Sequence, residues 1–196
     1  MDGTITKEET LPKIAKYFDI SKEIDTLTKD AISGNISFED SFIKRVEILK
    51  DYPISEVAFL LKSTKLFDEL VDFIQLHKHQ CAIITGNLDV WIEHLVKKLG
   101  CKVYSSKAIV KNDKIIKIKT ILNKENIVKR YKALGLNVVV IGDSYNDIDA
   151  MKCANISIAS TMVHQVDNSV LEVAQHIIND IDQLLKLLKG YKNENR

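Results

Sequence analysis

Apolar residues recur every three or four positions through residues 8–79 of the chain. This spacing places them on one face of a helix, and the alternation typical of a strand is nearly absent from the stretch. The pattern predicts a small bundle of about four helices, which ends in a longer helix near residues 65–78. The positions that carry this helical pattern include Leu11, Ile14, Ala15, Phe18, Ile24, Leu27, Phe38, Phe42, Val46 and Leu49.

From residue 80 onward, short apolar runs alternate with helical patterns. The runs CAIITG (81–86) and VVVIGD (138–143) have the length and composition of buried strands, and ISIAS (156–160) and HIIND (176–180) follow them. Helices are predicted after both of the first two runs, and the tail 181–191 predicts a closing helix. Because strands and helices alternate, we expect an α/β fold with a parallel sheet.

Residues 102–120 interrupt this alternation of strand and helix. Apolar and polar residues alternate on both sides of Asn112 and Asp113, two residues that favour tight turns. The segment therefore predicts a β-hairpin.

Composition limits the kinds of partner. The 196 residues are 45% hydrophobic and 28% charged, with a formal net charge of +1, so no overall field favours nucleic acid or an anionic membrane. The 3 cysteines are widely separated, which fits a reducing cytosol better than a disulfide framework. No secretory pattern and no long apolar stretch is present. We expect a cytoplasmic protein whose partner is a small molecule, with neither nucleic acid nor membrane involved.

Polar groups gather at three places where strands are expected to end: Asp2–Thr4, Thr85–Asn87 and Gly142–Asp147. Ligands of open parallel sheets bind beyond the carboxyl ends of the strands. Asp143 and Asp147 would lie together at a strand end and the first turn of the next helix, as hard oxygen ligands suited to Mg²⁺. The alternative is that Asp143 caps that helix and Asp147 only complements its dipole.

The order of these motifs resembles that of the haloacid dehalogenase superfamily of phosphotransferases. The chain has DGT at residues 2–4, a strand ending in Thr85 and Gly86, a lysine that opens a helix, and GDSYND at 142–147. The resemblance covers nearly the whole chain. It implies a Rossmann-like core formed by residues 1–7 and 76–196, with a helical cap at 8–75 inserted after the first motif.

In that superfamily the first motif is Asp-x-Asp-Gly-Thr or a close variant, and Asp2 matches its second aspartate. The nucleophilic aspartate would then stand immediately before Met1, at the end of a first central strand that the given sequence lacks. Such a strand would bury roughly five apolar side chains at about 2 kcal/mol each, comparable to the stability of a whole domain. We therefore expect the natural protein to begin upstream, and residues 1–196 alone to lack turnover.

The resemblance also implies a mechanism. A carboxylate attacks the phosphate monoester to form an aspartyl phosphate, which water then hydrolyses. Mg²⁺ would be held by the missing aspartate, by the main-chain carbonyl of Asp2 and by the carboxylate of Asp143, with Asp147 supporting the metal site. Thr85 would donate a hydrogen bond to the phosphoryl group and Lys124 would neutralise it, while Asp2 would act as general acid and base.

The choice of Lys124 depends on its place in the sequence. It opens a helix directly after the predicted hairpin and ahead of the VVVIGD strand. The same stretch supplies other lysines, Lys129 among them, and most lysines are simply solvated.

The helical insertion is similar in order and spacing to the cap of the phosphoserine phosphatase branch. By that resemblance, Glu9 contacts the substrate ammonium, Arg45 clamps its carboxylate and Phe38 shields the site. A phosphorylated amino acid has three charged groups, so one anion, one bidentate cation and a phosphate site would recognise it. The alternative is that Glu9 and Arg45 belong to ordinary polar helix faces.

The second motif departs from that branch, which commonly has Ser-Gly-Gly where this chain has Thr85, Gly86 and Asn87. Thr85 keeps the hydroxyl, and Gly86 and Asn146 remain expected substrate contacts, but Asn87 adds a side chain near the amino-acid end of the substrate. The sequence therefore defines the type of reaction more closely than the identity of the substrate. Phosphate esters of homoserine, ethanolamine, choline or sugars remain alternatives, as does a non-catalytic relative that has lost its nucleophile.

Overall fold

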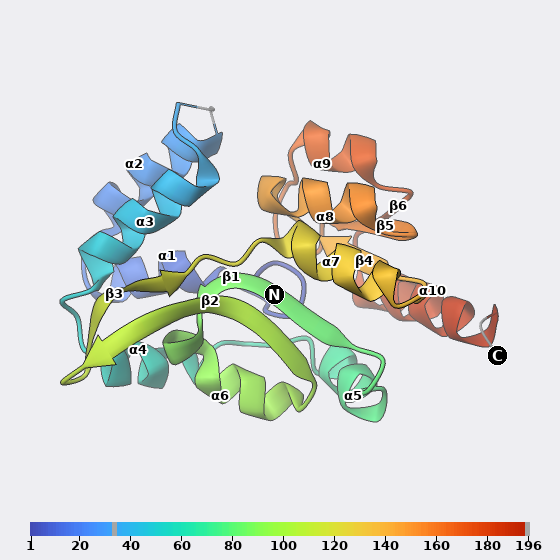
Figure 1. The fold of residues 1–196 in the computed structure, drawn as a ribbon, viewed down its shortest axis with the longest axis horizontal. Coiled ribbons are helices and arrows are strands. Elements are labelled where there is room, and N and C mark those ends of the chain that lie inside the picture. The colour runs from blue at the N-terminus through green and yellow to red at the C-terminus, as the bar shows by residue number, and fades with distance from the viewer. Residues whose placement is uncertain (33–34, 195–196) are drawn as a thin grey trace. The chain divides into compact units, whose positions relative to one another are not determined.

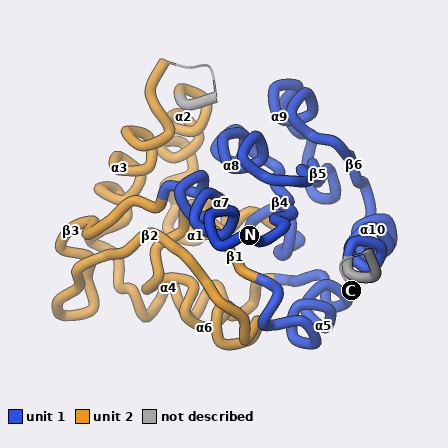
Figure 2. The backbone as a smooth tube through the Cα atoms, turned by 45° about the vertical axis from the view of Figure 1, so that its right-hand side comes forward, with its two compact units in different colours: residues 1–7, 65–81, 123–196 blue, residues 8–64, 82–122 orange. Residues whose placement is uncertain are grey.

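The structure is a computed structural model that describes residues 1–32 and 35–194 of the chain. Its backbone divides into two compact units (Figure 2). Unit 1 comprises residues 1–7, 65–81 and 123–196, and unit 2 comprises residues 8–64 and 82–122.

Unit 1 is built on a parallel sheet of three strands in the order β4-β5-β6 (Figure 1). The strands are β4 (Val139–Gly142), β5 (Ile156–Ser160) and β6 (His176–Ile178). The helices of the unit are α5 (Asp68–Leu76), α7 (Lys124–Ala133), α8 (Ile148–Cys153), α9 (Asn168–Val173) and α10 (Ile181–Glu194), and the 3₁₀ turn η1 (Tyr145–Asp147) leads into α8.

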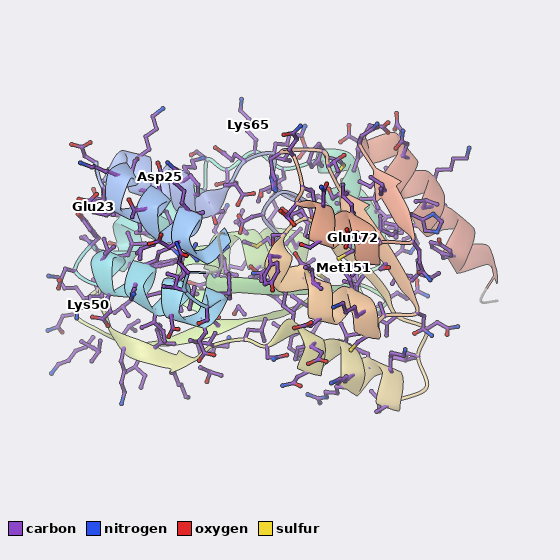
Figure 3. All side chains as sticks on the ribbon, turned by 90° about the horizontal axis from the view of Figure 1, so that it is seen from above. Glu23, Asp25, Lys50, Lys65, Met151 and Glu172 are labelled. Carbon is purple, nitrogen blue, oxygen red and sulfur yellow. The ribbon has the colours of Figure 1, made fainter. Side chains whose placement is uncertain are left out.

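The core of unit 1 follows from the apolar strand residues. Ile158 and Ala159 of β5 are fully buried, because β5 is the middle strand of the three. Helix α8 packs on β4 and β5, while α10 packs on β6 and on α5. Met151 of α8 is also buried (labelled in Figure 3). The carboxyl ends of β4 and β5 therefore lie at one edge of a well-packed sheet.

Unit 2 joins helices to a second sheet of three strands, in the order β1-β2-β3. β1 (Ala82–Leu88) pairs in parallel with β2 (Lys102–Lys111), which pairs in antiparallel fashion with β3 (Lys114–Thr120). The helices are α1 (Thr10–Tyr17), α2 (Ser21–Ile32), α3 (Phe38–Leu49), α4 (Ile54–Leu61) and α6 (Asp89–Leu99). Helix α6 packs on β1 and β2, α4 packs on α6, and α1 contacts α2 and α4.

The helices of unit 2 bury the apolar face that the sequence predicts. On α2, Ile24 is buried whereas Glu23 and Asp25 on either side of it are exposed (Figure 3). On α3, the N-cap Ser37 accepts a hydrogen bond from the N–H of Asp40, at 3.0 Å. The hydroxyl thereby satisfies one of the backbone donors that a helix start leaves without an intrahelical partner.

Several predicted elements differ from the structure. Residues 8–79 form five described helices where about four are predicted. The last of them, α5, is predicted to be a longer helix but has 9 residues, fewer than the 12 of α2 and of α3. Helix α9 lies in a segment for which the apolar pattern predicts no helix. The compact units share the predicted boundary after residue 7, but residues 82–122 cluster with the helical segment. The division into a 1–7 and 76–196 core with an 8–75 cap stays a prediction. Among the described residues, no helix is both long and apolar enough to span a bilayer.

The predicted hairpin is confirmed. Asn112 and Asp113 form its turn with φ values of 50° and 61°, a conformation that asparagine and aspartate tolerate better than most residues. The side chain of Asp113 accepts hydrogen bonds from the backbone N–H and the hydroxyl of Ser55, and its backbone carbonyl accepts one from the N–H of Ile54. The hairpin tip thus caps the start of α4, and these bonds lower the pKa of Asp113.

We expect Asp113→Ala to lower the thermal midpoint of the protein by roughly 2 to 4 °C, because it removes the cap of α4 and strains the turn. Asp113→Asn is the matched control. It keeps an acceptor oxygen and tolerates the positive φ, so its midpoint should stay within about 1 °C of the wild type. Equal losses in the two variants, measured by calorimetry, would remove the capping role.

Candidate active site

The turn after β4 is organised around the carboxylate of Asp147. One of its oxygens, Oδ2, accepts hydrogen bonds from the N–H of Asp143 and the N–H of Ser144, both at 3.3 Å, and from the Ser144 hydroxyl at 3.1 Å. A Cβ atom at Gly142 would lie 2.5 Å from the Cβ of Asp147, so only glycine fits at the end of this strand. The sequence GDSYND therefore folds back on itself and buries Asp147.

Lys124 forms an ion pair with the other oxygen of Asp147. The Lys124 Nζ lies 2.7 Å from Asp147 Oδ1 and 2.9 Å from Asn146 Oδ1, and both ionised side chains are about nine-tenths buried, at 11% and 9% exposure. Lys129, one turn along α7, instead pairs with Glu125 and remains 59% exposed. The lysine that opens α7 is thus the one that lies at the turn.

The N-terminal turn of the chain packs directly against Asp143. Gly3 has a φ of 64°, and a Cβ on it would lie 2.0 Å from Asp143 Oδ2, a contact that no side chain could make. The hydroxyl of Thr4 donates to Asp143 Oδ1 at 3.5 Å, and the Ser160 hydroxyl donates to the carbonyl of Gly3 at 3.2 Å. Asp2, the neighbour of Gly3, is therefore held close to the end of β4.

His164 is a further neighbour of Asp143 that the sequence analysis missed. Its Nε2 lies 3.5 Å from Asp143 Oδ2. His164 follows the end of β5 by four residues, and Asp143 directly follows the end of β4. Because the carboxyl ends of parallel strands meet at one edge of a sheet, this position in the sequence could have indicated that the two residues are neighbours.

The two carboxylates of the turn have opposite pKa shifts. Burial raises the pKa of Asp143 to about 6, and the charge of Asp147 adds to the rise, against the lowering effects of the Met1 ammonium, Lys124 and His164. Asp147 is buried too, but the ammonium of Lys124, with help from Met1 and the Ser144 hydroxyl, outweighs burial and lowers its pKa. Asp143 therefore remains an incompletely compensated carboxylate whose oxygens suit a hard divalent cation.

In unit 2, Thr85 is the middle residue of β1 and is 3% exposed. The parallel register with β2 shifts between Thr85 and Leu88, so Gly86 and Asn87 lie outside the regular ladder. The Thr85 hydroxyl accepts a hydrogen bond from the N–H of Asn87, at 3.2 Å. The second motif therefore lies at a bulge within β1, which continues to Leu88 instead of ending at Thr85 and Gly86 as the sequence predicts.

The predicted substrate residues of α3 share one face of that helix. The ring of Phe38 stacks on Phe42 at 6.3 Å between centroids, and the Arg45 guanidinium lies 5.9 Å from the Phe38 ring. The Nε of Arg45 donates to the carbonyl of Ser41 at 3.1 Å, and burial lowers the pKa of the guanidinium. Glu9 occupies the N-cap position of α1, where its side chain makes no capping bond.

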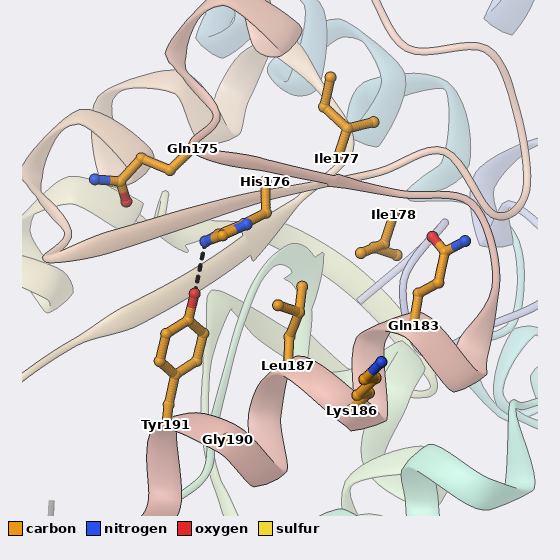
Figure 4. Close-up of a pocket in the computed structure, with 9 residues that line it drawn as sticks. All are labelled: Gln175, His176, Ile177, Ile178, Gln183, Lys186, Leu187, Gly190 and Tyr191. Atoms are coloured by element: carbon orange, nitrogen blue, oxygen red, sulfur yellow. Dashed lines mark hydrogen bonds between the residues drawn. The ribbon is translucent and has the colours of Figure 1, made fainter. Parts of the chain in front are cut away.

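A groove of about 640 Å³ lies between β6 and α10 (Figure 4). The Tyr191 hydroxyl and His176 Nε2 are 2.6 Å apart across it. It is lined by Gln175, His176, Ile177, Ile178, Gln183, Lys186, Leu187, Gly190 and Tyr191, none of which belongs to a predicted site.

The predicted site residues are therefore divided between the units. Unit 1 brings together Lys124, Asp143, Asn146 and Asp147, with the turn that carries Asp2 packed against them. Unit 2 carries the other five, which are Glu9, Phe38, Arg45, Thr85 and Gly86. The roles of all of these residues remain predictions.

Comparison with known proteins places this geometry in context. A family model described as haloacid dehalogenase-like hydrolase matches residues 1–155. The chain is 31% identical over 171 residues to a phosphoserine phosphatase of Methanocaldococcus jannaschii, with 81% of each chain covered. It is 26% identical to a phosphoserine phosphatase of Archaeoglobus fulgidus, of which it spans only 50%. It is also 28% identical to a 2-hydroxy-3-keto-5-methylthiopentenyl-1-phosphate phosphatase of Lysinibacillus sphaericus, with 81% of this chain and 78% of that protein covered.

Solved structures give the same picture. A structure titled as a phospho-aspartyl intermediate analogue of phosphoserine phosphatase superposes with a TM-score of 0.79 at 28% sequence identity. The match covers 97% of this chain and 95% of the other. The similarity thus extends across both compact units.

The raised pKa of Asp143 predicts how stability depends on pH when divalent ions are removed by a chelator. Below pH 3.8 the carboxyl group of Asp143 is protonated in both the folded and the unfolded chain, so its ionisation does not affect stability. As the pH rises from 3.8 through about 6, the unfolded chain ionises more readily than the folded protein, and the free energy of unfolding therefore falls. We expect Asp143→Asn to be more stable than the wild type at pH 7.5, by on the order of 2 to 3 kcal/mol, and the gap to close near pH 4.

Asp147→Asn is the control, because the pKa of Asp147 is lowered and its ionised form stabilises the fold. This variant should be less stable than the wild type at pH 7.5. Urea unfolding at the two pH values measures both effects. A gap between Asp143→Asn and the wild type that does not change with pH would contradict the assignment.

Proposed function

We propose that this chain, which belongs to the haloacid dehalogenase-like hydrolase family, hydrolyses a small phosphate monoester, and that the ester is O-phospho-L-serine. The observation that carries the proposal is the buried cluster in unit 1. There Lys124 is paired with Asp147, and Asp143 lies against the DGT turn. A phosphoryl transition state spreads negative charge over its oxygens, so a buried ammonium and a carboxylate fit to hold a cation are the groups that such a reaction needs.

A divalent ion fits this cluster, because the Asp143 carboxylate is buried and only partly compensated. The carboxylate of Asp143 and the main-chain carbonyl of Asp2 would hold Mg²⁺, which would supply positive charge to the transferring phosphoryl group. Asp147 is not a direct ligand in this scheme, since Lys124 and the donors of the turn already use its oxygens. It holds the ammonium of Lys124 in place.

The reaction would proceed through an aspartyl phosphate on the aspartate that the motif places before Met1. Asp2 would donate a proton to the serine oxygen as the phosphorus–oxygen bond breaks, and would then take a proton from the water that hydrolyses the intermediate. The Thr85 hydroxyl would hydrogen-bond the phosphoryl oxygens. The similarity to a phospho-aspartyl intermediate analogue supports this route.

Residues of unit 2 would recognise the amino acid. The guanidinium of Arg45 is partly desolvated, and its hydrogen bond to Ser41 uses Nε, which leaves the terminal nitrogens to bind a carboxylate in bidentate fashion. Glu9 would bind the ammonium, and Phe38 would exclude water. Gly86 would contact the substrate through its main-chain amide, and Asn146 of unit 1 would contact it through its carboxamide.

A second candidate keeps the chemistry and changes the ester. The Lysinibacillus sphaericus relative, named for a phosphorylated keto compound, supports a small phosphate ester without an amino-acid group. The phosphoserine reading would place the protein in serine biosynthesis in the cytoplasm. Phosphoserine is favoured over the second candidate because Glu9 and Arg45 would pair with its ammonium and its carboxylate, two groups that the other ester lacks.

The experiment is a phosphate-release assay on the natural chain, including any residues encoded in frame before Met1, with Mg²⁺ and a panel of esters. The panel contains phosphoserine, phosphohomoserine, phosphoethanolamine, phosphocholine, a sugar phosphate and an aryl phosphate. The proposal expects the highest kcat/KM for phosphoserine and loss of activity with a chelator. A preference for an ester that lacks the ammonium and the carboxylate of an amino acid would support the second candidate, and no release from any ester would support a non-catalytic relative.

Arg45→Ala should lower kcat/KM for phosphoserine about 10²-fold, because the substrate carboxylate loses a charged, bidentate partner. Turnover of phosphoethanolamine and of an aryl phosphate, which lack the carboxylate, should change less than about 3-fold. Lys44→Ala, an exposed neighbour on the same helix, is the control and should change neither. Equal losses on all three esters would exclude Arg45 from substrate recognition.

Lys124→Ala should lower kcat by roughly 10² to 10³-fold on every ester, since it removes a positive charge from a buried site where charge develops. Lys129→Ala is matched to it, because Lys129 lies on the same helix but pairs with Glu125 at the surface. Its kcat should remain at the wild-type value. A similar loss of kcat in both variants would indicate that the substitutions disturb helix α7, and that the charge of Lys124 is not specifically required.

A further inference from the structure

Asn87 links the bulged end of β1 to the first residue of α1. Its side-chain Nδ2 donates to the hydroxyl of Thr10 at 3.1 Å, and its Oδ1 lies 3.4 Å from the same hydroxyl. Thr10 is fully buried. The backbone N–H of Asn87 donates to the Thr85 hydroxyl. A continuous chain of hydrogen bonds thus joins Thr85, Asn87 and Thr10, and all three residues belong to unit 2.

Glu9 directly precedes Thr10 and is the N-cap residue of α1, with an extended backbone at φ −79° and ψ 128°. Its backbone carbonyl accepts the first intrahelical hydrogen bond, from the N–H of Lys13 at 3.4 Å. The position of Glu9 therefore depends on where α1 begins. Fixing the Thr10 side chain to the end of β1 fixes that point.

We propose that Asn87 is a positioning residue that sets the place of Glu9 relative to the Thr85 hydroxyl. The inference rests on the proposed function, in which Glu9 binds the ammonium of the substrate and Thr85 its phosphoryl group. With both groups held by one hydrogen-bonded chain, the site accepts an ammonium at a set separation from the phosphate. Asn87 acts here through Thr10, and its own contact with the substrate is not required.

The hydrogen bond between Asn87 and Thr10 preorganises the start of α1. A hydrogen bond between two partly or fully buried neutral groups contributes about 1 kcal/mol, and breaking it leaves a buried hydroxyl to find another partner. Without it, the first turn of α1 would sample several positions, and the substrate ammonium would have to order that turn on binding. The loss should therefore appear for substrates that carry an ammonium and be absent for substrates that do not.

The test is a double-mutant cycle in the natural chain. Asn87→Ala removes the carboxamide, and Thr10→Val removes the hydroxyl while keeping its shape. Each should raise KM for phosphoserine about 5 to 10-fold with little change in kcat, and the double variant should be no worse than either single one. For 3-phosphooxypropanoate, which is phosphoserine without its ammonium group, the change should stay below about 2-fold.

Two additional readouts separate positioning from a general structural role. Thr10→Ser restores a hydroxyl and should recover most of the affinity for phosphoserine. Hydrogen exchange of the Lys13 amide reports the start of α1 directly, and should be faster in Asn87→Ala and in Thr10→Val than in the wild type.

Three results would overturn the proposal. They are equal losses for phosphoserine and 3-phosphooxypropanoate, additive effects in the double variant, and unchanged exchange at Lys13. If the wild type hydrolyses no phosphate ester, the proposed function fails, whereas the exchange measurement still decides whether Asn87 fixes α1.

Discussion

The ion pair between Lys124 and Asp147 is the interaction on which the rest of the candidate site depends. Because it compensates a buried carboxylate, Asp147 stays ionised and can gather the N–H groups of the turn around its second oxygen. That turn places Asp143 against the backbone of Gly3, where burial opposes its charge. One satisfied carboxylate thus holds a second, less satisfied one in place, which is the arrangement that favours a bound cation.

In unit 2, side chains from distant parts of the sequence fix the starts of two helices. Asp113 at the hairpin tip caps α4, and Asn87 at the end of β1 holds Thr10 at the start of α1. Such contacts place residues of predicted function, like Glu9, on rigid elements. A site built in this way can select among substrates of similar chemistry, because each recognition group has a set position.

Patterns that are local in sequence predicted most of the fold. The apolar runs became β1, β4, β5 and β6, and Asn112 with Asp113 formed the turn of the hairpin. The family, the α/β class and the phosphatase type of enzyme are confirmed by the comparisons. Helix α9 was missed because it has only six residues, too few for a periodic pattern, although Asp167 caps it. The neighbours of Asp143 depend on which loops meet at the edge of the sheet. The pattern of apolar and polar residues around His164 does not predict that its loop lies beside Asp143.

Diffraction from crystals of the natural chain grown with Mn²⁺ in place of Mg²⁺ would show whether Asp143 and Asp2 hold a divalent ion, since the anomalous signal of manganese locates the ion without assumptions about its ligands. We expect one strong peak within coordination distance of the Asp143 carboxylate and the main-chain carbonyl of Asp2, with Lys124 still paired to Asp147. A manganese ion bound elsewhere, or a crystal saturated with Mn²⁺ that has no peak beside Asp143, would contradict it.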